Sequence, residues 1–290
     1  MTVLEAFLQG LLQGFTEFLP VSSSGHLSLF QYFTGNSGES AFLFSILLHA
    51  GTLVAVCIVF WKTILTLAVE FFALLSDLIG KRFLPRDMRP ERRMLLLLLV
   101  SLLPLFGMLL LKDLISGFSS DNDITVEGFC FLLTGITLLF ASRHDRGRKD
   151  ARNMTRRDAL VIGAAQAVAT MPGISRSGST ISAGMLCGLN REYVVSYSFI
   201  LGIPAVLGAI VLEVKDALQE GLTLPLPVVL TGFFSAVVFG ILSIKLVQWV
   251  VRGNKLKYFG YYTLGLGLLV IVIGMFDHLT GHILQQMLVG

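Results

Sequence analysis

The sequence predicts an all-α integral membrane protein with six transmembrane helices and two re-entrant helical hairpins, arranged as an inverted-topology repeat. Three observations lead to this fold class. Of the 290 residues, 54% are hydrophobic and only 14% are charged, which is outside the range of soluble globular domains. Six apolar stretches are about as long as a membrane-spanning helix. Lys and Arg gather in the loops on one side of those stretches.

The first element, residues 1–34, is apolar but is interrupted by Pro20, the serines at 22–24 and Gly25. Irregular backbone inside a bilayer is tolerated only where protein buries it or where it lines a wet cavity. We therefore expect a re-entrant hairpin of two short helices joined by a polar turn. A pair of amphipathic helices lying in the membrane interface is the alternative interpretation of this segment.

The second interrupted segment, residues 158–189, follows three predicted spans and is broken by Pro172, Gly173 and Gly178. By the same argument we expect a second re-entrant hairpin there. Three more spans complete the chain. The six predicted spans cover residues 41–60, 94–111, 124–142, 193–213, 227–251 and 258–276.

Basic residues set the orientation of the spans. The segments 61–93, 143–157 and 252–257 carry most of the Lys and Arg, whereas the loops 112–123 and 214–226 are mainly acidic. Loops rich in Lys and Arg stay in the cytoplasm. With this sidedness the first hairpin begins and ends outside, and the second begins and ends inside. The first basic segment is also partly amphipathic, so we expect it to lie along the inner leaflet.

These orientations predict a single membrane domain, residues 1–290, built from two repeats of opposite orientation. The first repeat, 1–142, contains the first hairpin and three spans, and the second repeat, 158–276, contains the second hairpin and three spans. In both hairpins a Gln precedes a Gly by twelve residues, with a proline and serines between them. Interrupted segments at corresponding places in two halves indicate a site near the midplane of the membrane.

The second hairpin carries the sequence MPGISRSGST at residues 171–180, which predicts an anion site. Gly173 and Gly178 permit close approach of the backbone, and Arg176 supplies a planar, permanent positive charge. A turn that leads into a helix also points free N–H groups at a ligand, and phosphate fits this set best. Alternatively, the serines and glycines only cap a helix while Arg176 extends to water. A charge inside an apolar segment favours a functional site.

The first hairpin offers groups that complement an anion site. Gln13 and Glu17 are four residues apart and share one helix face. Glu17 is a candidate proton acceptor or ligand of a divalent cation, and Gln13 is a candidate for orienting phosphate or water. His26 is a candidate for activating a hydroxyl, donating to a leaving oxygen or attacking phosphorus. The alternative is a wet face of an interfacial helix and a buried His with a structural role.

Three segments together resemble one known family. The sequences QGFTEFLPVSSSGH, PGISRSGST and NREYVVSYSFILGIPAVLGA are similar to those of the undecaprenyl diphosphate phosphatases of bacteria, the bacitracin resistance family. The resemblance extends over essentially the whole chain. It implies removal of the terminal phosphate of undecaprenyl diphosphate at the outer, periplasmic or exterior, face of the cytoplasmic (inner) membrane. That reaction would recycle the lipid carrier for peptidoglycan synthesis.

The resemblance also implies roles for individual residues. The catalytic set is Glu17, Ser23, His26 and Arg176, and the substrate-binding set is Gln13, Ser22, Ser175, Ser177 and Thr180. Family members depend on a divalent metal, here Mg²⁺ or Ca²⁺, for which Glu17 is the candidate protein ligand. Because the first motif position holds the neutral Gln13, the diphosphate oxygens are expected to supply most of the metal ligands.

The nucleophile is open between Ser23, His26 and water, and we favour Ser23 assisted by His26. In this hypothesis Arg176 neutralises the phosphoryl oxygens and Glu17 handles the proton. The type 2 phosphatidic acid phosphatases have similar short motifs. Six residues after Arg176, where that class has a His, this chain has Ser182, so that class is disfavoured.

A lipid-phosphate flippase or anion transporter is the rival function, because inverted repeats and a midplane anion site would serve a carrier as well. An acid, a base and a nucleophile together favour the enzyme. The expected partners are the lipid diphosphate, membrane lipids and, as an open alternative to a monomer, a second copy in a homodimer. No nucleic-acid partner is expected. His49, inside the first span, is expected to have a structural role.

Overall fold

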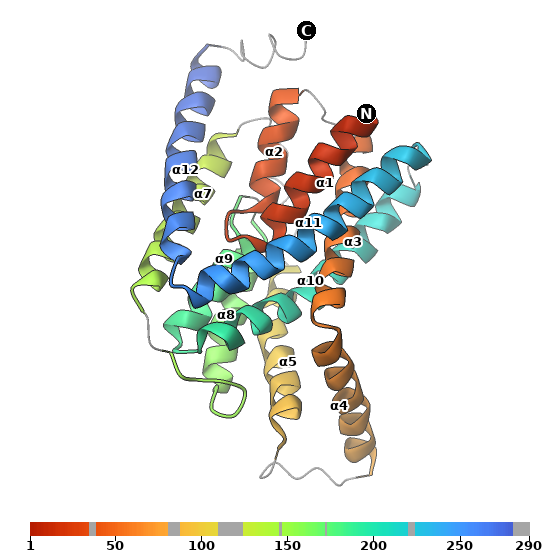
Figure 1. The fold of residues 1–290 in the computed structure, drawn as a ribbon, viewed down its shortest axis with the longest axis vertical. Coiled ribbons are helices and arrows are strands. Elements are labelled where there is room, and N and C mark those ends of the chain that lie inside the picture. Colours follow the sequence, from red (N-terminus) through yellow and green to blue (C-terminus); the bar gives the residue numbers. More distant parts are fainter. Residues whose placement is uncertain are drawn as a thin grey trace.

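The computed structural model describes residues 1–34, 39–80, 88–109, 124–144, 147–171, 173–219 and 224–280. Within these residues every regular element is an α helix (Figure 1). The helices are α1 (Val3–Phe18), α2 (Ser23–Thr34), α3 (Glu39–Val59), α4 (Trp61–Ile79), α5 (Pro90–Leu109), α7 (Thr125–Ser142), α8 (Arg156–Val168), α9 (Arg176–Leu186), α10 (Arg191–Gln219), α11 (Leu226–Arg252) and α12 (Leu256–Leu279).

Four of the described helices are long and apolar enough to cross a membrane, namely α7, the Arg191–Val211 part of α10, α11 and α12. They coincide with the last four predicted spans. The first predicted span forms α3, which meets α4 at an angle of 86°, and this pair makes a fifth crossing if it is one broken span. The second lies in α5 and extends past the described residues. The chain is thus an all-helical, multi-pass membrane protein, and six spans stay a prediction.

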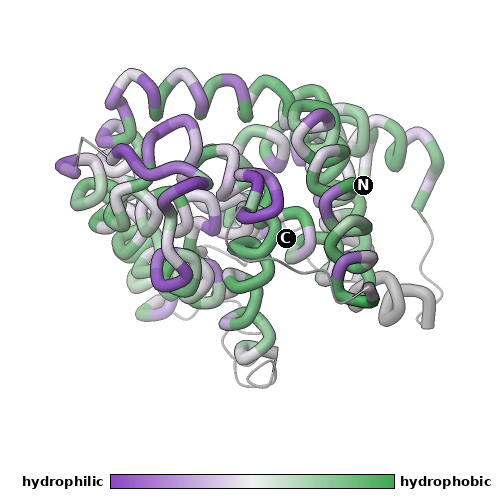
Figure 2. The backbone as a smooth tube through the Cα atoms, turned by 90° about the horizontal axis from the view of Figure 1, so that it is seen from below, coloured by the Kyte–Doolittle hydropathy of each residue, from purple (hydrophilic) through white to green (hydrophobic). Residues whose placement is uncertain are grey.

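Hydrophobic residues run along most of the described helices (Figure 2), and many of their large apolar side chains are exposed. On α7, for example, Phe129, Ile136 and Phe140 are each more than half exposed. They lie seven and four residues apart, so they form one apolar stripe along the helix. Continuous exposed apolar surface of this kind is unfavourable in water. It is the surface expected of helices that face lipid.

Small residues let the helices approach closely. A Cβ added to Gly10 of α1 would lie 2.0 Å from Ser235 Oγ of α11, and one added to Gly14 would lie 2.9 Å from the carbonyl oxygen of Ala236. The α7–α12 pair is equally close, since a Cβ on Gly128 would meet backbone atoms of α12. Close packing at small residues drives helix association where lipid, and not water, surrounds the helices.

Each interrupted segment forms two short helices that pack on each other, α1 with α2 and α8 with α9. The capping interactions of the two segments correspond. A capping box of Thr2 and Glu5 begins α1, and one of Thr155 and Asp158 begins α8. At the break, a serine hydroxyl accepts the N–H three residues later, from Gly25 in α2 and from Gly178 in α9. The corresponding residues are a constant 153 positions apart, as Thr2 is from Thr155 and Ser22 from Ser175.

Helices of the first half pack on helices of the second. α7 lies along α12, α1 along α11 and α5 along α8, and α3 contacts both α10 and α11 (Figure 1). The two halves therefore interlock. Both hairpin turns lie inside this bundle, because Glu17, Ser22, Ser175 and Ser177 are all buried.

Candidate active site

Glu17, in the last turn of α1, is the meeting point of the two hairpins. Its side chain is 6% exposed. Arg176 Nη2 donates to Glu17 Oε1 at 2.6 Å, and Ser23 Oγ donates to Oε2 at 2.7 Å. Gln13 Nε2, one helical turn earlier, also donates to Oε2, at 2.9 Å. One buried carboxylate thus holds the cation of the second hairpin and a hydroxyl of the first.

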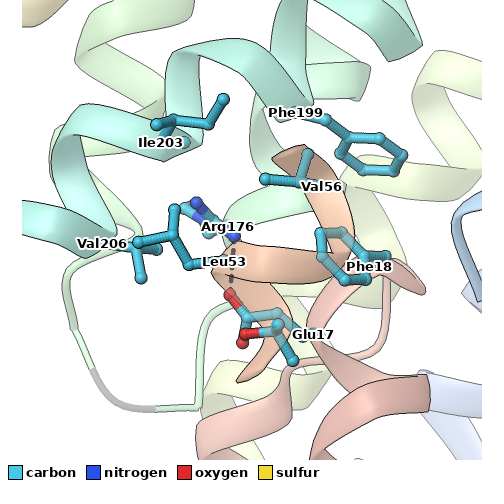
Figure 3. A pocket seen from close by; sticks show the side chains of 10 residues that line it. Glu17, Phe18, Leu53, Val56, Arg176, Phe199, Ile203 and Val206 are labelled. Atoms are coloured by element: carbon cyan, nitrogen blue, oxygen red, sulfur yellow. Dashed lines mark hydrogen bonds and ion pairs between the residues drawn. The ribbon is translucent and has the colours of Figure 1, made fainter. Parts of the chain in front are cut away.

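Arg176 is the first residue of α9, and its guanidinium points at Glu17 (Figure 3). Gly202 of α10 leaves room for this group, because a Cβ there would lie 2.0 Å from Arg176 Nη1. The walls around the ion pair are apolar and come from Phe18, Leu53, Val56, Phe199, Ile203 and Val206. Charges interact more strongly in such surroundings than in water. An anion that reaches this pocket therefore meets a cation that is already in place.

The two breaks also contact each other directly. Ser24 Oγ accepts the backbone N–H of Gly173 at 3.2 Å. In return, Ser177 Oγ donates to the carbonyl oxygen of Leu19 at 3.0 Å. A serine just after each break therefore bonds to the backbone of the other break. This pair of bonds brings the two motifs of the sequence analysis together at one place.

His26 lies on the side of α2 that faces α7 and α12. Its Nδ1 is 2.7 Å from the carbonyl oxygen of Ser22, and its Nε2 is 2.8 Å from the hydroxyl of Tyr262. Ser22 itself has φ = 72°, in the left-handed region that non-glycine residues seldom occupy. Among the described contacts His26 has no hydrogen bond to Ser23. His26 is thus bonded to the backbone of the serine turn on one side of its ring and to Tyr262 of α12 on the other.

Two of the predicted diphosphate ligands are used within the protein. Ser175 Oγ accepts the N–H of Gly178 and caps α9. The hydroxyl of Thr180 bonds to Ser198 of α10 and to the carbonyl oxygen of Arg176. Both residues are about 1% exposed. Their positions suit them to hold the start of α9 and, through it, Arg176.

Three further residues lie at the site that the sequence did not single out as functional: Tyr262, Gly202 and His49. Tyr262 belongs to no local motif, and Gly202 was given no role although it lies in the segment NREYVVSYSFILGIPAVLGA. The packing of α12 and α10 brings both residues to the site. His49 was expected to be structural, and its Nδ1 does contact the carbonyl oxygen of Ser45. Its Nε2 also lies 3.9 Å from Glu17 Oε2. A His inside an apolar span was the one available signal.

The residues at Glu17 fit a metal that is held mainly by its substrate. No cluster of three or more His, Cys, Asp and Glu side chains occurs among the described residues, so a cage made only of protein ligands is not present there. Gln13 Oε1 is buried and has no hydrogen-bond partner. A buried amide oxygen beside a carboxylate is a suitable pair of ligands for Mg²⁺, which commonly takes its remaining ligands from phosphate and water.

Comparison with known proteins gives one consistent match. A family model described as bacitracin resistance protein BacA matches residues 6–269. The chain is 41% identical over 281 residues to the undecaprenyl-diphosphatase of Methanosphaera stadtmanae, covering 95% of this chain and 99% of the relative. It is 38% identical over 278 residues to that of Alkaliphilus metalliredigens, covering 95% and 100%. For Treponema denticola the identity is 39% over 275 residues, covering 92% and 96%.

Proposed function

The chain belongs to the bacitracin resistance protein BacA family, and from that membership we propose that it hydrolyses undecaprenyl diphosphate to undecaprenyl phosphate and inorganic phosphate. Its relatives bear the name undecaprenyl-diphosphatase. One observation in the structure carries the proposal for the site. Glu17 bonds at the same time to Arg176 and to Ser23, so a cation, a proton acceptor and a hydroxyl converge. This activity would recycle the lipid carrier for peptidoglycan synthesis and confer resistance to bacitracin.

The diphosphate is expected to bind by competing with Glu17 for Arg176. The first turn of α9 adds the positive end of a helix dipole at the same place. Charge on the terminal phosphoryl oxygens is what a phosphoryl-transfer enzyme must stabilise. As Arg176 turns to the substrate, Glu17 is left with its bonds to Ser23 and Gln13. This exchange would activate the hydroxyl only when substrate is present.

The proposed chemistry has two displacements. Ser23 Oγ attacks the terminal phosphorus, Glu17 Oε2 accepts the hydroxyl proton, and the anhydride P–O bond breaks with its electron pair on undecaprenyl phosphate. Water then attacks the phosphoserine, and Ser23 Oγ leaves and takes the proton back from Glu17. Inorganic phosphate is released. The 2.7 Å distance from Ser23 Oγ to Glu17 Oε2 supports the proton transfer.

A divalent cation, Mg²⁺ or Ca²⁺, is part of the proposal. Gln13 Oε1 and the Glu17 carboxylate would hold it, and the diphosphate oxygens would supply most of the other ligands. The cation would add positive charge where the phosphoryl group carries negative charge.

We also propose six spans and two re-entrant hairpins in an inverted repeat, in the inner membrane, with the active site open to the periplasm or the exterior. The constant offset of 153 residues between the caps of the two hairpins supports the repeat. So does the exchange of partners between halves, in which α1 packs on α11 as α8 packs on α5. A homodimer is the oligomeric state to test beside a monomer.

Release of inorganic phosphate from a short prenyl diphosphate by the purified full-length protein in detergent tests the activity. The wild type is expected to release phosphate, a chelator to abolish it, and Arg176→Ala to lower the rate by at least about 100-fold. The matched control is Arg152→Ala, in an exposed segment away from the site. An inactive wild type would refute the proposal. A flippase or carrier would bind the lipid and release no phosphate.

A further inference from the structure

We infer that Tyr262 and His26 are positioning residues that hold Ser23 against Glu17, a role that rests on the proposed phosphatase function. The chain of contacts begins on α12, in the second half of the protein. It passes from Tyr262 to His26 and from His26 to the carbonyl group of Ser22, and the next residue is Ser23. Nothing in the local sequence around Tyr262 indicates this role.

The hydrogen bonds determine the tautomer of His26. A carbonyl oxygen can only accept, so the 2.7 Å contact between Nδ1 and Ser22 O requires a proton on Nδ1. In the neutral ring Nε2 then carries the lone pair. The 2.8 Å contact with Tyr262 is therefore a bond that the tyrosine hydroxyl donates to Nε2. Both ring nitrogens are engaged at once.

Two aromatic neighbours contact the His26 ring. The Tyr262 ring lies nearly parallel to it, at 17° and with centroids 5.8 Å apart, and Phe131 meets it edge to face at 5.2 Å. Ring contacts of this kind restrict the rotation of the imidazole. His26 is thus held in one orientation by two hydrogen bonds and two rings.

That orientation supports an unfavourable backbone conformation. Ser22 has φ = 72°, a conformation that residues other than glycine seldom adopt and that surrounding contacts must hold in place. The Ser22 carbonyl oxygen accepts both the ring N–H and the backbone N–H of His26, at 2.7 and 3.2 Å. The resulting turn places Ser23 as the first residue of α2 with its hydroxyl on Glu17.

The same geometry leaves His26 with no free ring nitrogen for a phosphoryl group. Its only lone pair accepts from Tyr262, and the described contacts give it no bond to Ser23, Glu17 or Arg176. A nucleophilic or acidic His26 would have to break the bond to Tyr262 first. The arrangement therefore favours Ser23 as the nucleophile and gives His26 the task of holding the turn.

Three substitutions of His26 separate positioning from direct chemistry. The amide of Asn can place its NH₂ group where Nδ1 lies, whereas the longer Gln places it nearer to Nε2, and Ala places nothing. For positioning, His26→Asn keeps at least about a tenth of the wild-type kcat, and His26→Gln and His26→Ala lose about 100-fold. If His26 attacks phosphorus or donates a proton, Asn is as inactive as Ala, and the inference fails.

Tyr262→Phe tests the other end of the chain, with Tyr261→Phe as its matched control on an exposed neighbour. Loss of one hydrogen bond is expected to lower kcat by about 10-fold for Tyr262→Phe, with KM unchanged and the control at wild-type rate. A wild-type kcat for Tyr262→Phe would overturn the inference.

Two controls distinguish a failure of the positioning role from a failure of the proposed phosphatase function. Binding of a non-hydrolysable prenyl methylenebisphosphonate, measured for each variant, shows that the fold and the anion site persist. Phosphate release by the wild type tests the phosphatase activity independently of these variants. An active wild type with the ranking Asn above Gln and Ala supports the positioning role. An active wild type with any other ranking refutes the positioning role alone.

Discussion

At the scale of single residues, the charge of Glu17 is the property on which the proposed chemistry depends. Glu17→Gln keeps the size and polarity of the side chain but removes the proton acceptor and the partner of Arg176. We expect phosphate release to fall by about 100-fold to 10,000-fold. The matched control is Glu5→Gln, a half-buried carboxylate in the first turn of the same helix. Activity within a few-fold of wild type for Glu17→Gln would exclude Glu17 as the base.

Gly202 provides a second residue-scale test, because its missing side chain makes room for Arg176. A methyl group in Gly202→Ala would lie 2.0 Å from Nη1, so the guanidinium must move. A displacement of about 1 Å in a positioned group can reduce kcat/KM by about 100-fold. Gly208→Ala, on the same helix with no atom within 4 Å of its Cβ, should match the wild type. Equal activity of both variants would contradict this role of Gly202.

At the scale of elements, helix contact depends on small residues in facing backbones. Gly14→Ala would put a Cβ 2.9 Å from the Ala236 carbonyl oxygen and the Gly240 nitrogen. Because neither backbone atom can move easily, we expect a loss of about 1–3 kcal/mol in the free energy of unfolding. Gly265→Ala on α12 meets nothing within 4 Å and should be neutral or slightly stabilising. Unfolding in detergent, followed by loss of helical signal, compares the two.

The hairpins also show how far sequence reasoning reaches. Each break is marked locally by proline, glycine and serines, so the convergence of the two breaks at one site was expected, whereas the direct ion pair of Glu17 with Arg176 was not. Proline, glycine and serine influence the backbone conformation only of residues close to them in the sequence. The contact of His26 with Tyr262 joins residues 236 positions apart, and no periodicity or motif at Tyr262 indicates it. Ser175 and Thr180 were expected on the ligand; in the structure the Ser175 hydroxyl accepts the N–H of Gly178 and the Thr180 hydroxyl bonds to Ser198, and their role as substrate ligands stays a prediction.

At the scale of the whole molecule, the two halves are tied together through the site. Glu17 and Arg176 come from different halves, as do His26 and Tyr262. Composition alone predicted a membrane protein, and the apolar outer surface agrees with it. The 86° bend between α3 and α4 is the kind of turn required if the amphipathic segment after the first span lies along the inner leaflet, as its sequence predicts; that placement stays a prediction.

The inverted repeat leads to a prediction about sidedness. Val3 and Arg156 are the first residues of α1 and α8, both are exposed, and they occupy equivalent positions 153 residues apart. If the repeats have opposite orientation, these two residues lie on opposite sides of the membrane. In a variant without its native cysteines, a membrane-impermeant maleimide applied to intact cells should label Val3→Cys at once. Arg156→Cys should react only after permeabilisation, since its basic neighbours keep it in the cytoplasm. Labelling of both from one side would mean that the two hairpins enter from the same leaflet, and the inverted topology would have to be abandoned.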